Sequence, residues 1–366
     1  MPDNHNDFPE PDRRGFFYAL TPERVLQAVE QGGFVPSGHC SALNSLENRV
    51  YDVRLEDGRH VVAKFYRPAR WSRAQIEAEH EFLYELREAD IPVCAPLHFA
   101  DGNSIQETAG IYYALWPRTG GRAVDELDAE QTRVLGRLLA RIHNVGAGRP
   151  ESRRLQLNAA TYIEAPLKYL LESELIPAYL SDRYAAAARE MAQIYTELSA
   201  DVPTHRIHGD CHAGNLLYGA EGWFFLDFDD FLTGPAVQDV WMLLPARDDA
   251  ERARRAVFLE GYRTFREFSD HWLNLIEPLR AMRYVHYAAW IARRREDPAF
   301  PQAFPHFGSD EYWEQETLDL EEQVQICIGA QASLREHTGY AKHMAEEMEA
   351  EAELTNKDFF WDWEQD

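Results

Sequence analysis

The sequence predicts an α+β protein with a small β-rich N-terminal lobe and a larger, mainly helical C-terminal lobe. Through residue 115 the chain alternates strand-like and helix-like patterns, and from Glu126 onward the pattern is mostly helical. A short strand-and-loop region over residues 206–231 interrupts the helices and gathers acidic and polar residues. At 366 residues the chain is long enough for two such units to bury a large core.

The N-terminal lobe is expected to be a small antiparallel sheet that carries helices. Thr21-Pro22 supplies an N-cap and a first-turn proline for a helix that ends near Gly32. Asp57-Gly58 is a typical hairpin turn between two strand-like runs. The remaining elements are strands at 49–55 and 60–66, a helix at 71–89 that Pro92 terminates, and a strand at 111–116.

Composition shifts along the chain suggest five segments. Residues 117–121, Pro-Arg-Thr-Gly-Gly, are the best candidate for a hinge because they are polar and rich in glycine. The segments are an N-terminal extension at 1–14, the N-lobe at 15–116, the hinge at 117–121, the helical C-lobe at 122–340, and an acidic tail at 341–366.

The charge balance narrows the classes of partner. A formal charge of -25 disfavours bulk binding to nucleic acid or to an anionic membrane, since both would repel the chain. The sequence has no apolar run of the roughly 18 residues that a membrane helix needs, and no signal core at its start. The four cysteines are far apart and predict no disulfide framework. We therefore expect a cytoplasmic monomer.

The segment from His208 to Asn215 carries the strongest chemical signal. Asp210 and Asn215 have the spacing of the catalytic loop His-x-Asp-x-x-x-x-Asn, and Asp227 follows an apolar strand, where kinases place a metal ligand. Phosphoryl transfer requires a carboxylate to orient and deprotonate a hydroxyl, and oxygen ligands for Mg²⁺. We predict catalytic roles for Asp210 and Asp227, with Asn215 and Asp227 as ligands of Mg²⁺ and ATP as the phosphate donor.

Lys64, Glu79 and Ser45 are the candidates for contacts with the nucleotide. Lys64 ends the run Val61-Val62-Ala63, and kinases use a lysine at this place to bind phosphates. Glu79 is in line with the apolar stripe of the next helix, where a carboxylate needs a cation, so we predict a Lys64–Glu79 ion pair. The turn around Ser45 replaces a glycine-rich loop, and its hydroxyl and amides are suited to phosphate. An ordinary polar turn is an equal alternative.

Other residues near the motifs receive supporting roles. Asp239, at the start of a helix, is expected to cap amides of the catalytic loop. Asp229 stands where Asp-Phe-Gly kinases have glycine, and we expect a surface acid rather than a second metal ligand. An arginine-rich and aromatic stretch either lines the cleft or covers an ordinary helix surface. Its members are Arg280, Arg283, Tyr284, His286, Tyr287, Trp290, Arg293, Arg294 and Arg295.

Three alternatives to a protein kinase remain open. A metallophosphatase would explain the cluster of His205, His208, Asp210 and His212, but the chain lacks the upstream Asp-x-His of such enzymes. A kinase-shaped binding module without catalysis would not require an intact Asp210 and Lys64. A phosphotransferase acting on a small amino alcohol or antibiotic would use the same residues as a protein kinase.

The spelling His-Gly-Asp-x-His-x-x-Asn, with glycine in place of arginine, resembles the aminoglycoside phosphotransferase and choline kinase group. Longer stretches resemble a bacterial stress-response kinase branch of that group, among them residues 44–51, 64–68, 234–239 and 276–283. The similarity extends from about residue 20 to about residue 325.

This resemblance implies a bilobal protein-kinase-like fold of the aminoglycoside phosphotransferase type, with ATP and Mg²⁺ in a cytoplasmic enzyme. It also implies a protein substrate phosphorylated on Ser or Thr, including the kinase itself, and a role in stress survival. Carried over by position, Asp210 is the catalytic acid, Asn215 and Asp227 bind magnesium, and Ser45 contacts ATP. The chain departs from kinases at the missing glycine-rich loop and at Asp229.

Overall fold

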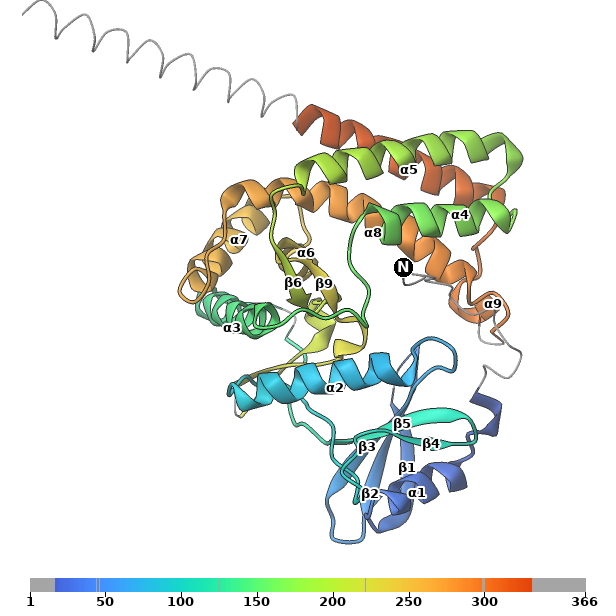
Figure 1. Ribbon diagram of the computed structural model, residues 1–366, viewed down its shortest axis with the longest axis vertical. Helices are drawn as coiled ribbons and strands as arrows, with labels where there is room; N and C mark the ends of the chain where they lie inside the picture. The colour runs from blue at the N-terminus through green and yellow to red at the C-terminus, as the bar shows by residue number, and fades with distance from the viewer. Residues whose placement is uncertain are drawn as a thin grey trace, which may run out of the picture.

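The computed structural model describes residues 17–43, 45, 47–124, 126–220, 222–297 and 300–330. Within these ranges an N-terminal sheet is followed by a helical part, so the expected α+β architecture is confirmed (Figure 1). The predicted extension at 1–14 and acidic tail at 341–366 lie outside the described residues. Among the helices described, none is both long and apolar enough to cross a membrane.

The N-terminal part is built on one antiparallel sheet with strand order β1-β2-β3-β5-β4. Its strands are β1 (Pro36–Leu43), β2 (Arg49–Leu55), β3 (His60–Phe65), β4 (Gln106–Thr108) and β5 (Ile111–Pro117). The predicted hairpin is correct, since Arg54 pairs with His60 across the turn at Gly58, whose φ of +84° suits glycine. The three-residue β4 was not predicted, because so short a strand leaves no periodicity to detect.

One helix covers each face of this sheet. Val61, Ala63 and Phe65 of β3 share a buried cluster with Val25 and Val29 of α1 (Pro22–Gln31). The alternating residues point to the other face, which α2 (Arg73–Glu88) covers on the side towards the helical part (Figure 1). Because Lys64 belongs to this second set, the period of the strand turns its side chain towards α2.

The helical part holds two short β-pairs among its helices. The helices are α3 (Ala129–Ala147), a π-helical turn η2 (Ala160–Glu164), α4 (Ala165–Glu172), α5 (Ala178–Leu198), α6 (Val237–Leu243), α7 (Asp249–Tyr262), α8 (Ile276–Ala292), α9 (Phe300–Ala303) and residues 310–330. β6 (Thr204–Ile207) pairs with β9 (Leu232–Pro235), and β7 (Leu216–Gly219) pairs with β8 (Gly222–Phe225). The loops that join these four strands carry the acidic motifs.

The connection between the two parts runs through the predicted hinge. β5 ends at Pro117, and residues 118–121 form no regular structure. Arg122 then exchanges two backbone hydrogen bonds with Tyr218, at 3.0 and 2.9 Å, which fixes the far end of the connection to β7. Movement about this segment stays a prediction.

Buried neutral histidines predict that acid destabilises the fold. His80 is 1% exposed between the Tyr66 hydroxyl and Ser104, and burial lowers its pKa from 6.5 to about 3. Below pH 6.5 His80 is protonated in the unfolded chain but stays neutral in the folded protein. The free energy of unfolding therefore falls as the pH falls. At about pH 5 this costs about 2 kcal/mol for this one histidine. Urea unfolding at pH 7.5 and 5.0 should show a smaller acid loss in His80→Gln; equal losses would contradict the assignment.

Candidate active site

The catalytic loop lies between β6 and β7 and is held by its backbone. Asp239 accepts hydrogen bonds from the amides of His208 and Gly209, each at 2.8 Å, so the predicted capping role is confirmed. His143 contacts the Asp239 carboxylate at 3.0 Å and the Tyr262 hydroxyl at 2.8 Å, all within the core. A buried carboxylate with this many partners fixes the position of the loop.

Gly209 is required by the close approach of two loops. Its φ is +83°, and an added Cβ would lie 2.4 Å from the backbone oxygen of Asp230. A side chain here would push the catalytic loop away from the segment that carries Asp227.

We therefore expect Gly209→Ala to lose most turnover. The clash is with backbone, which cannot rotate away, and the left-handed conformation costs roughly 1–2 kcal/mol more for alanine. Steady-state phosphate transfer and the free energy of unfolding should fall together. Gly308→Ala, also at positive φ (+85°) but with open space around its Cβ, controls for the backbone cost alone. Equal activity in the two variants would refute the proposed close contact.

Asp210 lines the cleft, and an arginine and a histidine each contact one of its carboxylate oxygens. Arg283 Nη1 lies 3.3 Å from Oδ1, and His212 Nε2 lies 3.5 Å from Oδ2. Burial opposes ionisation, but the hydrogen bond from His212 and the charge of Arg283 outweigh it and lower the pKa of Asp210 to about 2. Asn215 donates to the Asp210 carbonyl at 3.0 Å, which links two of the predicted site residues directly.

Lys64 stands among three carboxylates. Its Nζ lies 3.6 Å from Glu79 Oε1 and 3.1 Å from one oxygen each of Asp227 and Asp229. The predicted Lys64–Glu79 ion pair is thus present. Burial lowers the pKa of Lys64, but the charges of Asp227, Asp229 and Glu79 raise it well above its usual range. Glu79 is fully buried, and this burial raises its pKa to about 8.

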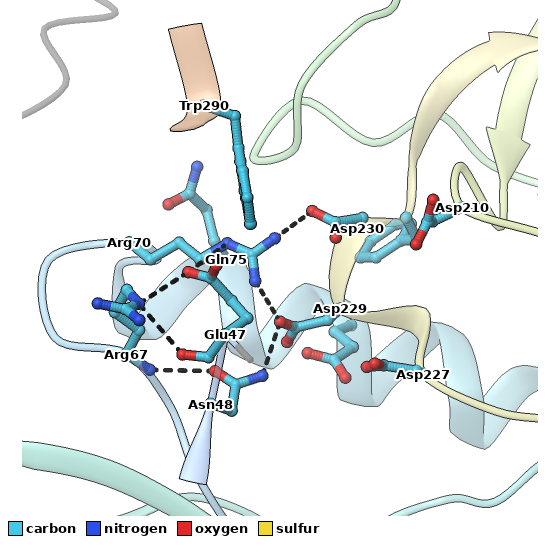
Figure 2. A network of polar contacts seen from close by, with 12 residues as sticks. Glu47, Asn48, Arg67, Arg70, Gln75, Asp210, Asp227, Asp229, Asp230 and Trp290 are labelled. Atoms are coloured by element: carbon cyan, nitrogen blue, oxygen red, sulfur yellow. Dashed lines mark hydrogen bonds and ion pairs between the residues drawn. The ribbon is translucent and has the colours of Figure 1, made fainter. Parts of the chain in front are cut away.

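The expectation that Asp229 is a surface acid is wrong. Its side chain is 4% exposed and lies 3.1 Å from Lys64 Nζ. It also contacts Arg70 at 2.7 Å and Asn48 Nδ2 at 3.0 Å (Figure 2). Arg154, buried between the rings of Trp71 and Phe231, donates to the Asp229 carbonyl. Burial raises the pKa of Asp229, but the charges of Lys64 and Arg70 have the larger opposite effect. The net pKa is below the usual value, so this carboxylate stays charged.

Arg70 and Glu47 belong to a polar network that no local sequence pattern predicted. Glu47 lies 3.1 Å from Arg67 and also contacts Arg70 (Figure 2). Arg294, just beyond the end of α8, pairs with the same carboxylate. Arg70 in turn contacts Asp229 and Asp230 (Figure 2). The network joins the turn before β2 to the helical part. Three acids in four residues at 227–230 were an available signal, because buried carboxylates require cations.

A cleft of about 790 Å³ lies between the two parts of the molecule and collects the predicted residues. Ser45, Lys64, Glu79, Asp210, Asn215 and Asp227 all line it. Four residues of the arginine-rich stretch line it as well, namely Arg283, His286, Tyr287 and Trp290, whereas Arg280 packs over Trp241 and contacts Glu277. One face of the stretch therefore lines the cleft, while other residues, such as Arg280, lie outside it. Each of the two predicted alternatives, cleft lining and ordinary helix surface, is correct for some of the residues.

The donor set fits a magnesium ion that arrives with phosphate. The Asp227 side chain is 53% exposed. Asn215 donates from its Nδ2 to the Asp210 carbonyl, and the Oδ1 of Asn215 accepts no hydrogen bond from the described residues. No group of three or more His, Cys, Asp or Glu gathers as a metal site in the described part of the chain. Mg²⁺ in nucleotide sites needs only one or two protein oxygens besides phosphate and water. His205 and His208 are buried away from such a role, which removes the basis for a metallophosphatase centre.

Comparison with known proteins decides the family. Residues 39–275 match the model of the phosphotransferase enzyme family. The chain belongs to the phosphotransferase enzyme family. The matched residues include the sheet apart from the first three residues of β1, together with the catalytic loop and the 227–230 segment, so the family assignment covers every predicted site residue.

Relatives within this phosphotransferase family agree with the resemblance found in the sequence. The chain is 42% identical over 312 residues to "Serine/threonine protein kinase RdoA" of Salmonella typhimurium, covering 85% of this chain and 94% of the relative. It is 39% identical over 311 residues to "Stress response kinase A" of Escherichia coli (strain K12), with the same coverage. The predicted relationship to stress response kinase A is confirmed.

A solved structure supports the phosphotransferase fold. Amicoumacin kinase hAmiN, in complex with AMP-PNP, Ca²⁺ and Ami, aligns with a TM-score of 0.67 at 21% identity, over 83% of this chain and 94% of that chain. The predicted fold class is thereby confirmed. At this identity the likeness shows the fold alone.

Proposed function

We propose that this phosphotransferase transfers the γ-phosphate of ATP to a Ser or Thr hydroxyl of a protein, including its own chain, in a stress response. The observation that carries the proposal is the joining of Asp210, Asn215 and Asp227 with Lys64 in one cleft. The names of the relatives support the protein acceptor and the stress role. We further propose that the enzyme acts as a cytoplasmic monomer.

Each residue has a defined task in this proposal. Asp210 orients the acceptor hydroxyl and takes its proton, and Lys64, held by Glu79, binds the phosphates. Ser45 and the backbone beside it contact the nucleotide from the turn before β2. Asn215 and Asp227 would hold Mg²⁺, which supplies positive charge against the phosphate oxygens when bound.

The test is to incubate the purified protein with ATP and Mg²⁺ and locate phosphate on the chain by mass spectrometry. Phosphoserine or phosphothreonine in the wild type, absent from Asp210→Asn, is the expected result. Phosphate on both proteins would reject Asp210 as the catalytic residue. ATP consumption without any phosphorylated Ser or Thr, on this chain or on an offered protein, would favour a small-molecule acceptor instead.

A further inference from the structure

One face of α8 forms the wall of the cleft next to Asp210. Arg283, His286, Tyr287 and Trp290 are spaced three, four and seven residues apart, so they project from the same side of the helix and all line the cleft. Tyr162 of η2 stacks on His286 with ring centroids 4.1 Å apart and completes this wall. An acceptor hydroxyl must reach Asp210, so the rest of the acceptor lies against these side chains.

The charges of this wall disfavour a cationic acceptor. Each carboxylate that lines the described cleft already contacts a cation. The pairs are Glu47 with Arg67, Arg70 and Arg294; Glu79, Asp227 and Asp229 with Lys64; Asp230 with Arg70; and Asp210 with Arg283. The lining face of α8 adds one guanidinium and no acid. An ammonium group of the acceptor would have to displace the cation of an existing ion pair, whereas an anionic group could bind to Arg283.

Arg283 is held loosely enough to change partners. Its only carboxylate contact among the described residues is Asp210, at 3.3 Å, longer than the 2.7–2.9 Å typical of charge-assisted hydrogen bonds. The side chain is 41% exposed, and its guanidinium lies 5.9 Å from the ring of Tyr287. The contact nevertheless occupies Oδ1, one of the two oxygens of Asp210.

We propose that the acceptor carries a carboxylate next to its hydroxyl, and that this carboxylate draws Arg283 away from Asp210. The inference rests on the proposed function and names the class of acceptor: a peptide with an acidic residue adjacent to its Ser or Thr. Arg283 then both selects the acceptor and covers the catalytic carboxylate until the acceptor binds.

With Oδ1 released, Asp210 accepts the proton of the hydroxyl while the hydroxyl oxygen bonds to the γ-phosphorus of ATP. The bond from the γ-phosphorus to the β,γ-bridging oxygen breaks, and its electron pair leaves with ADP. The acidic side chain stays paired with Arg283 throughout. Without an acceptor, covered Asp210 is a poor base towards water, which limits wasteful hydrolysis of ATP.

The net charge of the chain does not oppose this assignment at contact distance. At -25 the protein repels an acidic peptide at long range and lowers its association rate. Physiological salt screens that field beyond roughly 8 Å. The pairing with Arg283 acts within the cleft, well inside this distance.

The first experiment measures ADP release with ATP and Mg²⁺ but no peptide, for wild type, Arg283→Gln and Arg283→Lys. We expect Arg283→Gln to release ADP about fivefold faster than wild type, because its Asp210 is uncovered, and Arg283→Lys to lie between them. Arg295→Gln, an exposed residue just beyond the end of α8, removes the same charge and should match wild type. Unchanged or slower release in Arg283→Gln overturns the covering role.

The second experiment uses two synthetic peptides that differ only in Glu or Gln on each side of a single serine. Wild type should phosphorylate the Glu peptide with about tenfold higher kcat/KM, and Arg283→Gln should lose this preference. A wild type that prefers the Gln peptide, or uses neither, overturns the inference. If wild type releases ADP no faster than Asp210→Asn when either peptide is present, the proposed function itself is rejected, and the inference with it.

Discussion

Asp210→Asn should lower kcat by about 10³-fold while leaving nucleotide affinity within about twofold. Asparagine keeps the shape of the side chain and its backbone contact with Asn215, but it cannot accept a proton from the acceptor. The residues proposed for the nucleotide, Ser45 and Lys64, do not contact the Asp210 side chain. Steady-state phosphate transfer and titration with a fluorescent ATP analogue would measure the two quantities separately.

A matched control comes from α7. Asp249 is 95% exposed at its side chain, and its one ion pair within the described part of the chain is with Arg252, so Asp249→Asn removes the same charge at the protein surface. It should keep wild-type kcat and wild-type affinity. A loss of nucleotide affinity in Asp210→Asn equal to its loss of kcat would show that the residue organises the site rather than takes the proton.

Lys64→Met should impair both stability and turnover, for separable reasons. Methionine keeps the apolar stem but leaves Glu79 without its cation and Asp229 with Arg70 alone. Breaking a buried ion pair costs about 3–5 kcal/mol, and the raised pKa of Glu79 reduces this because it can take up a proton. We expect a loss of about 2–3 kcal/mol in denaturant unfolding. Loss of the phosphate contact should lower kcat/KM by roughly 10²–10³-fold.

The double variant Lys64→Met/Glu79→Gln separates the two effects. A neutral glutamine needs no cation, so the double variant should regain most of the lost unfolding free energy while kcat/KM stays as low as in Lys64→Met. Glu79→Gln alone should keep part of the activity, since Lys64 still has Asp227 and Asp229 as partners. Activity that returns together with stability in the double variant would mean that Lys64 serves the fold and not the phosphates.

The chemistry-bearing residues were predictable where a local pattern dictated their direction. The alternation of β3 places Lys64 opposite the face that packs on α1, and the stripe of α2 places Glu79 on the buried side of that helix. Each inference needs only the period of one element. Their ion pair followed from the cost of a buried carboxylate, without knowledge of the distance between the two elements.

The network around Asp229 and Arg70 was not predictable in the same way. Arg70 lies in a loop without periodicity, and its partners Asp229 and Asp230 are about 160 residues further along the chain. Glu47 and Arg294 are even further apart in sequence and meet only because the helical part folds back over the turn before β2. Long-range ion pairs of this kind depend on how the elements pack, not on any one of them.

By itself the sequence determined the order and type of the main elements, the spacing of Asp210, Asn215 and Asp227, and the relationship to the phosphotransferase family. The elements and the spacing follow from short-range rules, namely side-chain periodicity, turn chemistry and the separation of polar groups along the chain, and the family relationship follows from the resemblance of the motifs. Only the tertiary structure decided that Asp229 is buried, that Arg283 lies against Asp210, and that one face of α8 lines the cleft. The physical reason is that burial and charge pairing are set by the surroundings of a side chain, and those surroundings come from distant segments.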